Sequence, residues 1–178
     1  MSKSAAALHD VLDERIAALL ANEGVVSVDL QELVDASVSA AIVRSTATLL
    51  GFSGKDAAEI ATSAAELASN AVLHAGGGSL DVHCSPELLV ITVIDRGKGS
   101  AAVVRERLRG ATARAESDGL PSPLAPTITT GLGLGLGAVA RLMCGVAVEE
   151  RDGGGLLVRA WKRRAVTEGD VDGGGAAA

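Results

Sequence analysis

The order of the hydrophobic patterns along the chain constrains its fold more than any other sequence feature. Helical patterns follow one another in the first half, whereas strand patterns come in pairs separated by turn residues. The helical ranges are 31–50 and 54–75, and the strand ranges are 25–30, 79–84, 88–94, 146–150 and 156–162. Because helices and strands are grouped and not alternated, the sequence predicts an α+β fold, a two-layer α/β sandwich whose mostly antiparallel sheet carries helices on one face.

The core of this sandwich must be built from small aliphatic side chains. Hydrophobic residues make up 48% of the chain, yet Phe52 and Trp161 are its only aromatic residues. Small side chains allow helices to approach a sheet closely. The same scarcity leaves no row of aromatic platforms on which single-stranded bases could stack.

Charge and composition argue against several classes of function. A net charge of −6 argues against a nucleic-acid partner, because phosphate binding relies on clustered Lys and Arg. No apolar run approaches the roughly 20 residues of a membrane span, and no hydrophobic leader is present, so we expect a cytoplasmic protein without a membrane partner. Cys84 and Cys144 are isolated and form no metal-ligand pattern with the three histidines.

The chain divides into three expected parts. Residues 1–24 form an amphipathic helical extension, 25–164 the folded domain, and 165–178 a disordered tail. Within the extension, apolar residues recur at helical spacing over 5–22: Leu8, Val11, Leu12, Ile16, Leu19 and Leu20. Within the domain, we expect a short helix over 101–110 and a mobile loop over 111–130.

One polar pair lies on the helix expected at 54–75. Glu66 and Asn70 are one turn apart, so both side chains project from the same face. The Asn70 oxygen suits Mg²⁺, which takes few protein ligands beside phosphate and water. A carboxylate at Glu66 could orient or deprotonate a hydroxyl nucleophile. A solvated polar stripe is the alternative interpretation.

A turn of the form Asp-x-Gly-x-Gly ends the most apolar strand. An unpaired carboxylate at Asp95 would be costly there, so it needs a partner such as the exocyclic amine of a base. Gly97 and Gly99 let the backbone turn sharply and approach a ligand closely. A plain turn after a strand remains an alternative.

A glycine ladder precedes the last helix, which we expect over 137–144. Gly131, Gly133, Gly135 and Gly137 alternate with leucines that can anchor the backbone in the core. Backbone N–H groups at a helix N-terminus form a phosphate cradle. A flexible linker is the alternative, although regular leucines are unusual in linkers.

Together, the three motifs resemble the N, G1 and G2 boxes of the GHKL ATPase superfamily. They are Glu66-Leu67-x-x-Asn70-Ala71-Val72-x-His74-Ala75, then Asp95-x-Gly97-x-Gly99, then Gly131-Leu132-Gly133-Leu134-Gly135-Leu136. The chain is most similar to the bacterial anti-sigma-factor and switch serine/threonine kinases, and the Arg159-Ala160-Trp161-Lys162 ending favours the switch-kinase branch. The resemblance spans roughly 25–164.

This resemblance implies a Bergerat-type pocket for ATP and Mg²⁺. Asn70 would hold the metal, Asp95 would bind the adenine amino group, and Gly97 and Gly99 would shape the base pocket. Phosphate binding would fall to the ladder, namely Gly131, Leu132, Gly133, Leu134 and Gly135. Glu66 would be the catalytic base, and residues 100–130 would form an ATP lid.

The implied function is an ATP-dependent serine/threonine protein kinase in a bacterial partner-switching pathway of stress and sigma-factor regulation. Its partners would be a STAS-domain antagonist and a sigma factor or downstream phosphatase. The N-terminal helix would pack on the domain, form a homodimer or contact a partner.

Two alternatives stay open. The first is a non-catalytic, nucleotide-responsive module that sequesters a sigma factor or signalling partner. Lys98 in place of the usual proline, Ser100 in place of an aliphatic residue, and Gly155-Leu156 in place of Gly-Thr favour it. The second is the ATPase domain of a histidine kinase, disfavoured because no phosphoacceptor helix pair precedes the pocket.

Overall fold

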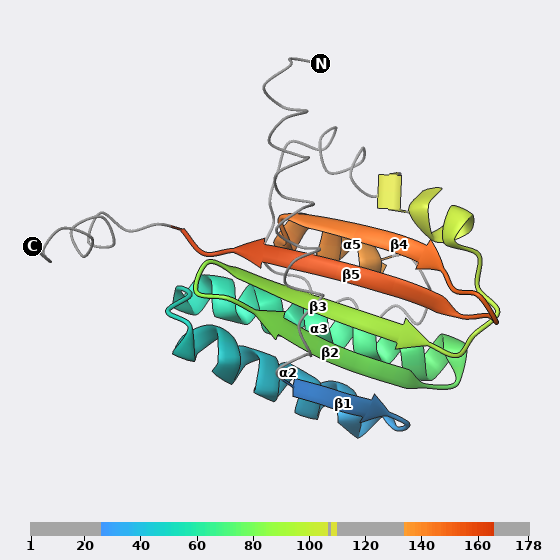
Figure 1. Cartoon of the computed structure of the whole chain (residues 1–178), viewed down its shortest axis with the longest axis horizontal. Coiled ribbons are helices and arrows are strands. Elements are labelled where there is room, and N and C mark those ends of the chain that lie inside the picture. Colours follow the sequence, from blue (N-terminus) through green and yellow to red (C-terminus); the bar gives the residue numbers. More distant parts are fainter. Residues whose placement is uncertain (1–25, 107, 110–133, 166–178) are drawn as a thin grey trace, which may run out of the picture.

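The computed structural model describes residues 26–106, 108–109 and 134–165, which form two layers (Figure 1). One layer is a five-stranded antiparallel sheet of order β1-β2-β3-β5-β4, and the helices pack on one of its faces. The strands are β1 Val26–Leu30, β2 Gly78–Cys84, β3 Leu88–Asp95, β4 Gly145–Glu150 and β5 Leu156–Arg163. The helices are α2 Leu33–Leu49, α3 Gly54–Ala75 and α5 Leu134–Leu142. The predicted α+β sandwich is confirmed.

The limits of α3 follow from local chemistry. Ser53 caps the N-terminus by accepting a hydrogen bond from the Asp56 N–H at 3.0 Å. Gly76 ends the helix in the left-handed conformation, at a φ of +71°, which glycine adopts without steric cost. Both boundaries confirm the sequence prediction.

The core lies between α3 and the inner face of the sheet. On α3, the side chains that face the sheet are buried at 0–3% exposure; they include Ile60, Ala64, Leu67 and Ala71. The sheet contributes alternate residues from its strands, as the period of two requires. The core side chains from the three central strands are Leu80, Val82, Leu89, Ile91, Val93, Leu156, Val158 and Ala160.

The start of the last helix differs from the prediction. The sequence indicated a helix over 137–144, but α5 spans Leu134–Leu142, so Gly135 and Gly137 are helical and not part of the preceding loop. The reason is tertiary. Val139 is fully buried and Leu136 packs against the core, and this packing outweighs the low helix propensity of glycine.

Other predicted segments are described only in part. Residues 101–106 and 108–109 are helical, in agreement with the short helix expected there. The expected helix over 5–22, the 111–130 loop and most of the 165–178 tail lie outside the described residues. Within the described ranges, no helix has the length and apolar character required to cross a membrane.

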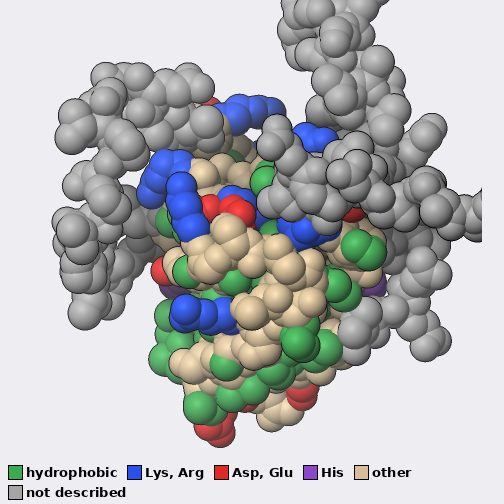
Figure 2. Space-filling view, turned by 90° about the vertical axis from the view of Figure 1, so that its left-hand side faces the viewer, with side chains coloured by type: hydrophobic (Ala, Val, Ile, Leu, Met, Phe, Trp, Pro, Cys, Tyr) green, Lys and Arg blue, Asp and Glu red, His purple; other side chains and the backbone are tan. Residues whose placement is uncertain are grey.

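One face of α2 is exposed and nearly uncharged. Leu33, Val34 and Val38 are 44–58% exposed at its N-terminal end, and Leu49 is 88% exposed at its other end. Figure 2 shows hydrophobic side chains spread over the lower part of that view, with Asp and Glu side chains at its lower edge, while most Lys and Arg side chains lie above. The opposite side of α2, with Ala36, Ser39, Val43 and Ala47 buried, is the side that packs, mainly against α3.

Candidate functional site

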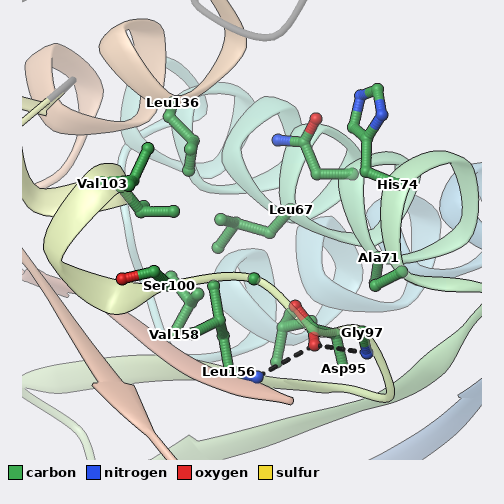
Figure 3. A pocket seen from close by; sticks show the side chains of 15 residues that line it. Leu67, Ala71, His74, Asp95, Gly97, Ser100, Val103, Leu136, Leu156 and Val158 are labelled. Atoms are coloured by element: carbon green, nitrogen blue, oxygen red, sulfur yellow. Dashed lines mark hydrogen bonds between the residues drawn. The ribbon is translucent and has the colours of Figure 1, made fainter. Parts of the chain in front are cut away.

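A pocket of about 290 Å³ opens between α3, the inner face of the sheet, the helical residues after Ser100, and α5 (Figure 3). This volume lies at the lower end of the range of about 300–1,000 Å³ that is typical of small-molecule sites. Its lining comprises Leu67, Asn70, Ala71, His74, Ala75, Val93, Asp95, Gly97, Gly99, Ser100, Val103, Val104, Leu136, Leu156 and Val158.

The walls of this pocket are mostly apolar. In Figure 3, the side chains of Leu67, Val103 and Leu136 converge on the same space. Val93 and Val158 are paired across β3 and β5 and contribute the floor. The pocket is therefore an apolar slot, suited to a flat, weakly polar group.

Asp95 is the carboxylate of this slot, and the backbone fixes its orientation. Its Oδ1 accepts hydrogen bonds from the N–H groups of Gly97 and Leu156, both at 2.9 Å. The sequence predicted a carboxylate that needs a partner, such as the exocyclic amine of a base. Two backbone donors hold one of its oxygens, and the second oxygen, Oδ2, could accept a hydrogen bond from a ligand.

Glycine is required at two places around Asp95. At Gly97, a Cβ atom would lie 2.8 Å from the Cβ of Ala75, so the turn after β3 packs directly against the end of α3. At Gly155, φ is +87°, and a Cβ atom would overlap the Asp95 carbonyl oxygen. This close approach brings the Leu156 N–H to the Asp95 side chain.

Glu66 and Asn70 meet the first turn of α5 beside the pocket. A Cβ atom at Gly135 would overlap the Glu66 carboxylate and would lie 3.8 Å from the amide nitrogen of Asn70. The first N–H groups of a helix lack partners within the helix. The fold therefore brings the carboxylate and amide of α3 together with the N-terminus of α5, which lies more than 60 residues later in the chain.

The described residues include only part of the predicted phosphate loop. Gly131, Leu132 and Gly133 lie outside them, Leu134 begins α5, and Gly135 contacts Glu66, the predicted base, and Asn70, the predicted metal ligand. Among the described residues, no group of three or more His, Cys, Asp or Glu side chains could hold a metal ion.

The sequence matches the family described as "Histidine kinase-like ATPase domain" over residues 15–162. The chain belongs to this family. The resemblance to the GHKL ATPases is thereby confirmed at the level of the ATPase domain. No curated protein matches the chain in sequence.

Two solved structures are similar to the chain. A chain in the crystal structure of the SiaB–SiaC complex from Pseudomonas aeruginosa is 13% identical, with a TM-score of 0.57, covering 86% of this chain and 98% of that one. The NMR structure of the histidine kinase domain of the E. coli osmosensor EnvZ is 20% identical, with a TM-score of 0.39, covering 88% and 98%. At this identity, the first likeness shows a shared fold.

Sequence reasoning missed one residue that positions the wall of the ATPase pocket. Glu150, at the end of β4, accepts hydrogen bonds from the Ala101 N–H at 3.0 Å and the Ser100 hydroxyl at 3.3 Å. It therefore anchors the start of the helical residues that carry Val103 and Val104. A lone glutamate at a strand end gives no sequence signal for this role.

Two departures from the family pattern have simple structural consequences. Lys98 is exposed, so its side chain does not fill the pocket. Ser100 lines the pocket and donates to Glu150. His74, which belongs to the first motif, lines the same pocket one turn beyond Asn70 and is a third polar group along that face of α3.

Proposed function

We propose that this chain is an ATP- and Mg²⁺-dependent serine/threonine protein kinase that phosphorylates a STAS-domain antagonist in a partner-switching pathway. The observation that carries the proposal is the contact of Gly135 with Glu66 and Asn70 at the mouth of the Asp95 pocket. A kinase needs a base-binding slot, a phosphate cradle and a carboxylate near the transferred group. Each of these three parts has candidate residues.

The adenine base would occupy the apolar slot. Asp95 Oδ2 would accept a hydrogen bond from the exocyclic amino group, because Oδ1 is already engaged by two backbone donors. Leu67, Leu136 and Val158 would pack against the ring faces. Burying both the ring and the charged acceptor gives this site selectivity for a base that carries an amine.

The phosphates would lie at the N-terminus of α5. Unpaired N–H groups and the helix dipole favour negative charge there. Asn70 would hold Mg²⁺ through its side-chain oxygen, with phosphate oxygens and water completing the coordination shell. Such an ion neutralises charge that develops on the phosphate oxygens during transfer.

Glu66 would serve as the base for the acceptor hydroxyl. The serine or threonine oxygen attacks the γ-phosphorus, the bond to the β,γ-bridging oxygen breaks, and ADP leaves. The hydroxyl proton passes to the Glu66 carboxylate. Because Glu66 lies next to Gly135, the base would stand close to the transferred group.

A protein partner is consistent with the structural comparison. The SiaB–SiaC structure contains a chain of this fold in complex with a second protein. The choice of a STAS-domain partner rests on the sequence resemblance. The same resemblance supports a sigma factor or phosphatase as a downstream partner, a cytoplasmic location and a role in the stress response.

The test separates binding from transfer. Purified STAS-domain proteins from the source organism are incubated with the chain, ATP and Mg²⁺, and phosphorylation is mapped by peptide mass spectrometry. ATP binding is measured in parallel by calorimetry. Wild type should bind ATP and phosphorylate one acceptor, Glu66→Gln should bind ATP but not transfer phosphate, and Asp95→Asn should bind ATP more weakly.

Two outcomes would overturn the kinase proposal. If ATP binds but no STAS-domain protein is phosphorylated, the chain is the nucleotide-responsive sequestering module. That alternative draws on the replacement of the family hydroxyl by Leu156, whose N–H contacts Asp95. If Glu66→Gln transfers phosphate at the wild-type rate, Glu66 is not the base.

A further inference from the structure

The outer face of the sheet, opposite the helices, is more apolar and more buried than an open face should be. Strand β3 reads Leu-Leu-Val-Ile-Thr-Val-Ile before Asp95, with apolar residues on both faces. A near-continuous apolar run is typical of a strand covered on both sides. On the outer face, Leu88 is 3% exposed, Val90 0% and Thr92 5%.

Neighbouring strands extend this face in register. Val90 pairs with His83 on β2 and with Trp161 on β5, and Thr92 pairs with Asp81 and Arg159. The indole of Trp161 lies against Gly145 on β4, where a Cβ atom would overlap its ring. We call the set Leu88, Val90, Thr92, Trp161 and Arg159 the outer patch.

Buried polar atoms without partners gather on the same face. Within the described part of the chain, five buried side-chain polar atoms lack a hydrogen-bond partner. Four of them lie on the outer face: His83 Nδ1, Thr92 Oγ1, Arg159 Nε and Trp161 Nε1. A buried polar atom left without a partner costs about 1–3 kcal/mol, so a cluster of four calls for a covering group that can pair with them.

We propose that the amphipathic N-terminal segment, residues 5–22, packs as a helix across the outer patch. As a helix, this segment would be roughly 27 Å long, at 1.5 Å per residue. Five strands spaced about 4.8 Å apart make a sheet roughly 20–24 Å wide between its outer edges. The helix is thus long enough to cover the sheet from edge to edge.

The point where the chain enters the sheet supports this occupant. Val26 begins β1 at the sheet edge and pairs with Val82, which pairs in turn with Ile91. This cross-strand row lies next to the row that contains Val90 and Trp161. Residues 23–25 span at most about 10 Å, so the end of the helix must lie close to that row.

The chemistry of the segment also matches the outer patch. Its apolar residues would cover the aliphatic side chains of β3. Arg159 Nε and Trp161 Nε1 are donors, and Asp13, which lies seven residues before Leu20 at the border of the apolar side, is the acceptor that the segment offers them. The resulting architecture has three layers, with a helix on each side of the sheet.

Trp161 gives a direct readout, because it is the single tryptophan of the chain. In the full-length protein, Leu12→Lys places a charge on the apolar side of the segment. Its matched control, Ala17→Lys, lies three residues after Glu14 and seven after Asp10, on the polar side. We expect Leu12→Lys to red-shift Trp161 emission and increase its quenching by acrylamide, whereas Ala17→Lys should leave both unchanged.

A milder pair keeps the proposal testable if Leu12→Lys fails to fold. Leu12→Cys and Ala17→Cys are made separately in a Cys84→Ala, Cys144→Ser background. We expect the Leu12→Cys thiol to react with a maleimide more slowly than the Ala17→Cys thiol in native buffer, and the two to react alike in denaturant.

Three results would overturn the proposal. The first is equal native reactivity of the two thiols. The second is a folded Leu12→Lys protein whose Trp161 is as shielded as in wild type, which would place the segment elsewhere. The third is shielding of Trp161 or of the thiol that disappears on dilution, which would assign the cover to a second copy of the chain.

Discussion

Gly135→Ala is the substitution for which the structure predicts a large effect on activity and a small effect on stability. A Cβ atom at this position would overlap the Glu66 carboxylate, which is the far end of a flexible side chain. Glu66 can therefore rotate away while the backbone of α5 stays in place. The variant should fold normally but hold the proposed base in the wrong position.

The magnitudes follow from three contributions. Replacing glycine by alanine in a helix stabilises it by about 0.5–1 kcal/mol. Forcing Glu66 into a poorer rotamer costs about 0.5–1.5 kcal/mol. The free energy of unfolding should therefore change by less than about 1 kcal/mol, a shift of about 2–4 °C in Tm at most. Losing general-base catalysis should slow phosphotransfer by about 10²–10⁴-fold.

Gly54→Ala is the matched control. It is also a glycine-to-alanine change within a helix, because Gly54 is the first residue of α3. A Cβ atom at Gly54, however, would meet nothing within 4 Å. Thermal unfolding and phosphotransfer to the acceptor found above are measured for both variants. Wild-type transfer rates in Gly135→Ala would refute the placement of the base, and a loss of more than about 2 kcal/mol of stability would refute the claim that Glu66 moves freely.

Three further predictions follow. Asp95→Asn should weaken ATP binding by about 10–100-fold in calorimetry, because a charge-assisted hydrogen bond contributes about 1.5–3 kcal/mol. An unchanged affinity would show that Asp95 does not bind the adenine base. Lys162→Met should lower the free energy of unfolding in urea by about 1–3 kcal/mol, because Lys162 donates to Glu59 at 2.5 Å and to the Leu142 carbonyl at 2.7 Å; an unchanged midpoint would contradict this. Ser53→Ala should lower the free energy of unfolding by about 1 kcal/mol, because the N-cap of α3 is lost. It should also make the protein lose less stability on acidification below about pH 4, and denaturation measured across pH tests both effects.

The pH effect has a definite sign. The Ser53 hydroxyl, which donates to the Asp56 carboxylate at 2.7 Å, is the largest cause of the lowered pKa of Asp56, and Lys162 adds to it against the opposing effect of burial. A depressed pKa in the folded state contributes stability above the unfolded pKa. That stability is lost as pH falls through the folded pKa. An identical acid profile in Ser53→Ala would contradict this assignment.

The pKa of Lys162 shows how its ion pairs outweigh its environment. Burial lowers the pKa of this lysine. Hydrogen bonds and charges from Glu59 and Asp56 raise the pKa by more than burial lowers it, so the net shift is upward. Lys162 is therefore charged at neutral pH and joins β5 to the start of α3 and the end of α5.

The predictability of the fold depended on how local each signal was. Both ends of α3 could be predicted because Ser53 and Gly76 act on their own backbone neighbours. The start of α5 could not, because its glycines favour a loop locally and only the packing of Leu136 and Val139 makes them helical. The same limit applies to Glu150, whose hydrogen bonds reach residues about fifty positions away in the chain.

By itself, the sequence determined the strand pairs, the helix caps and the three motifs that indicate an ATPase, because each depends on residues close together in the chain. The tertiary structure alone decided that Gly135 meets Glu66 and Asn70, and that the Leu156 N–H fixes one oxygen of Asp95. It also decided that four of the five unpartnered buried polar atoms of the described residues gather on one sheet face. Side-chain spacing along a helix or strand is fixed by backbone geometry, whereas contacts between distant segments depend on how the whole core packs.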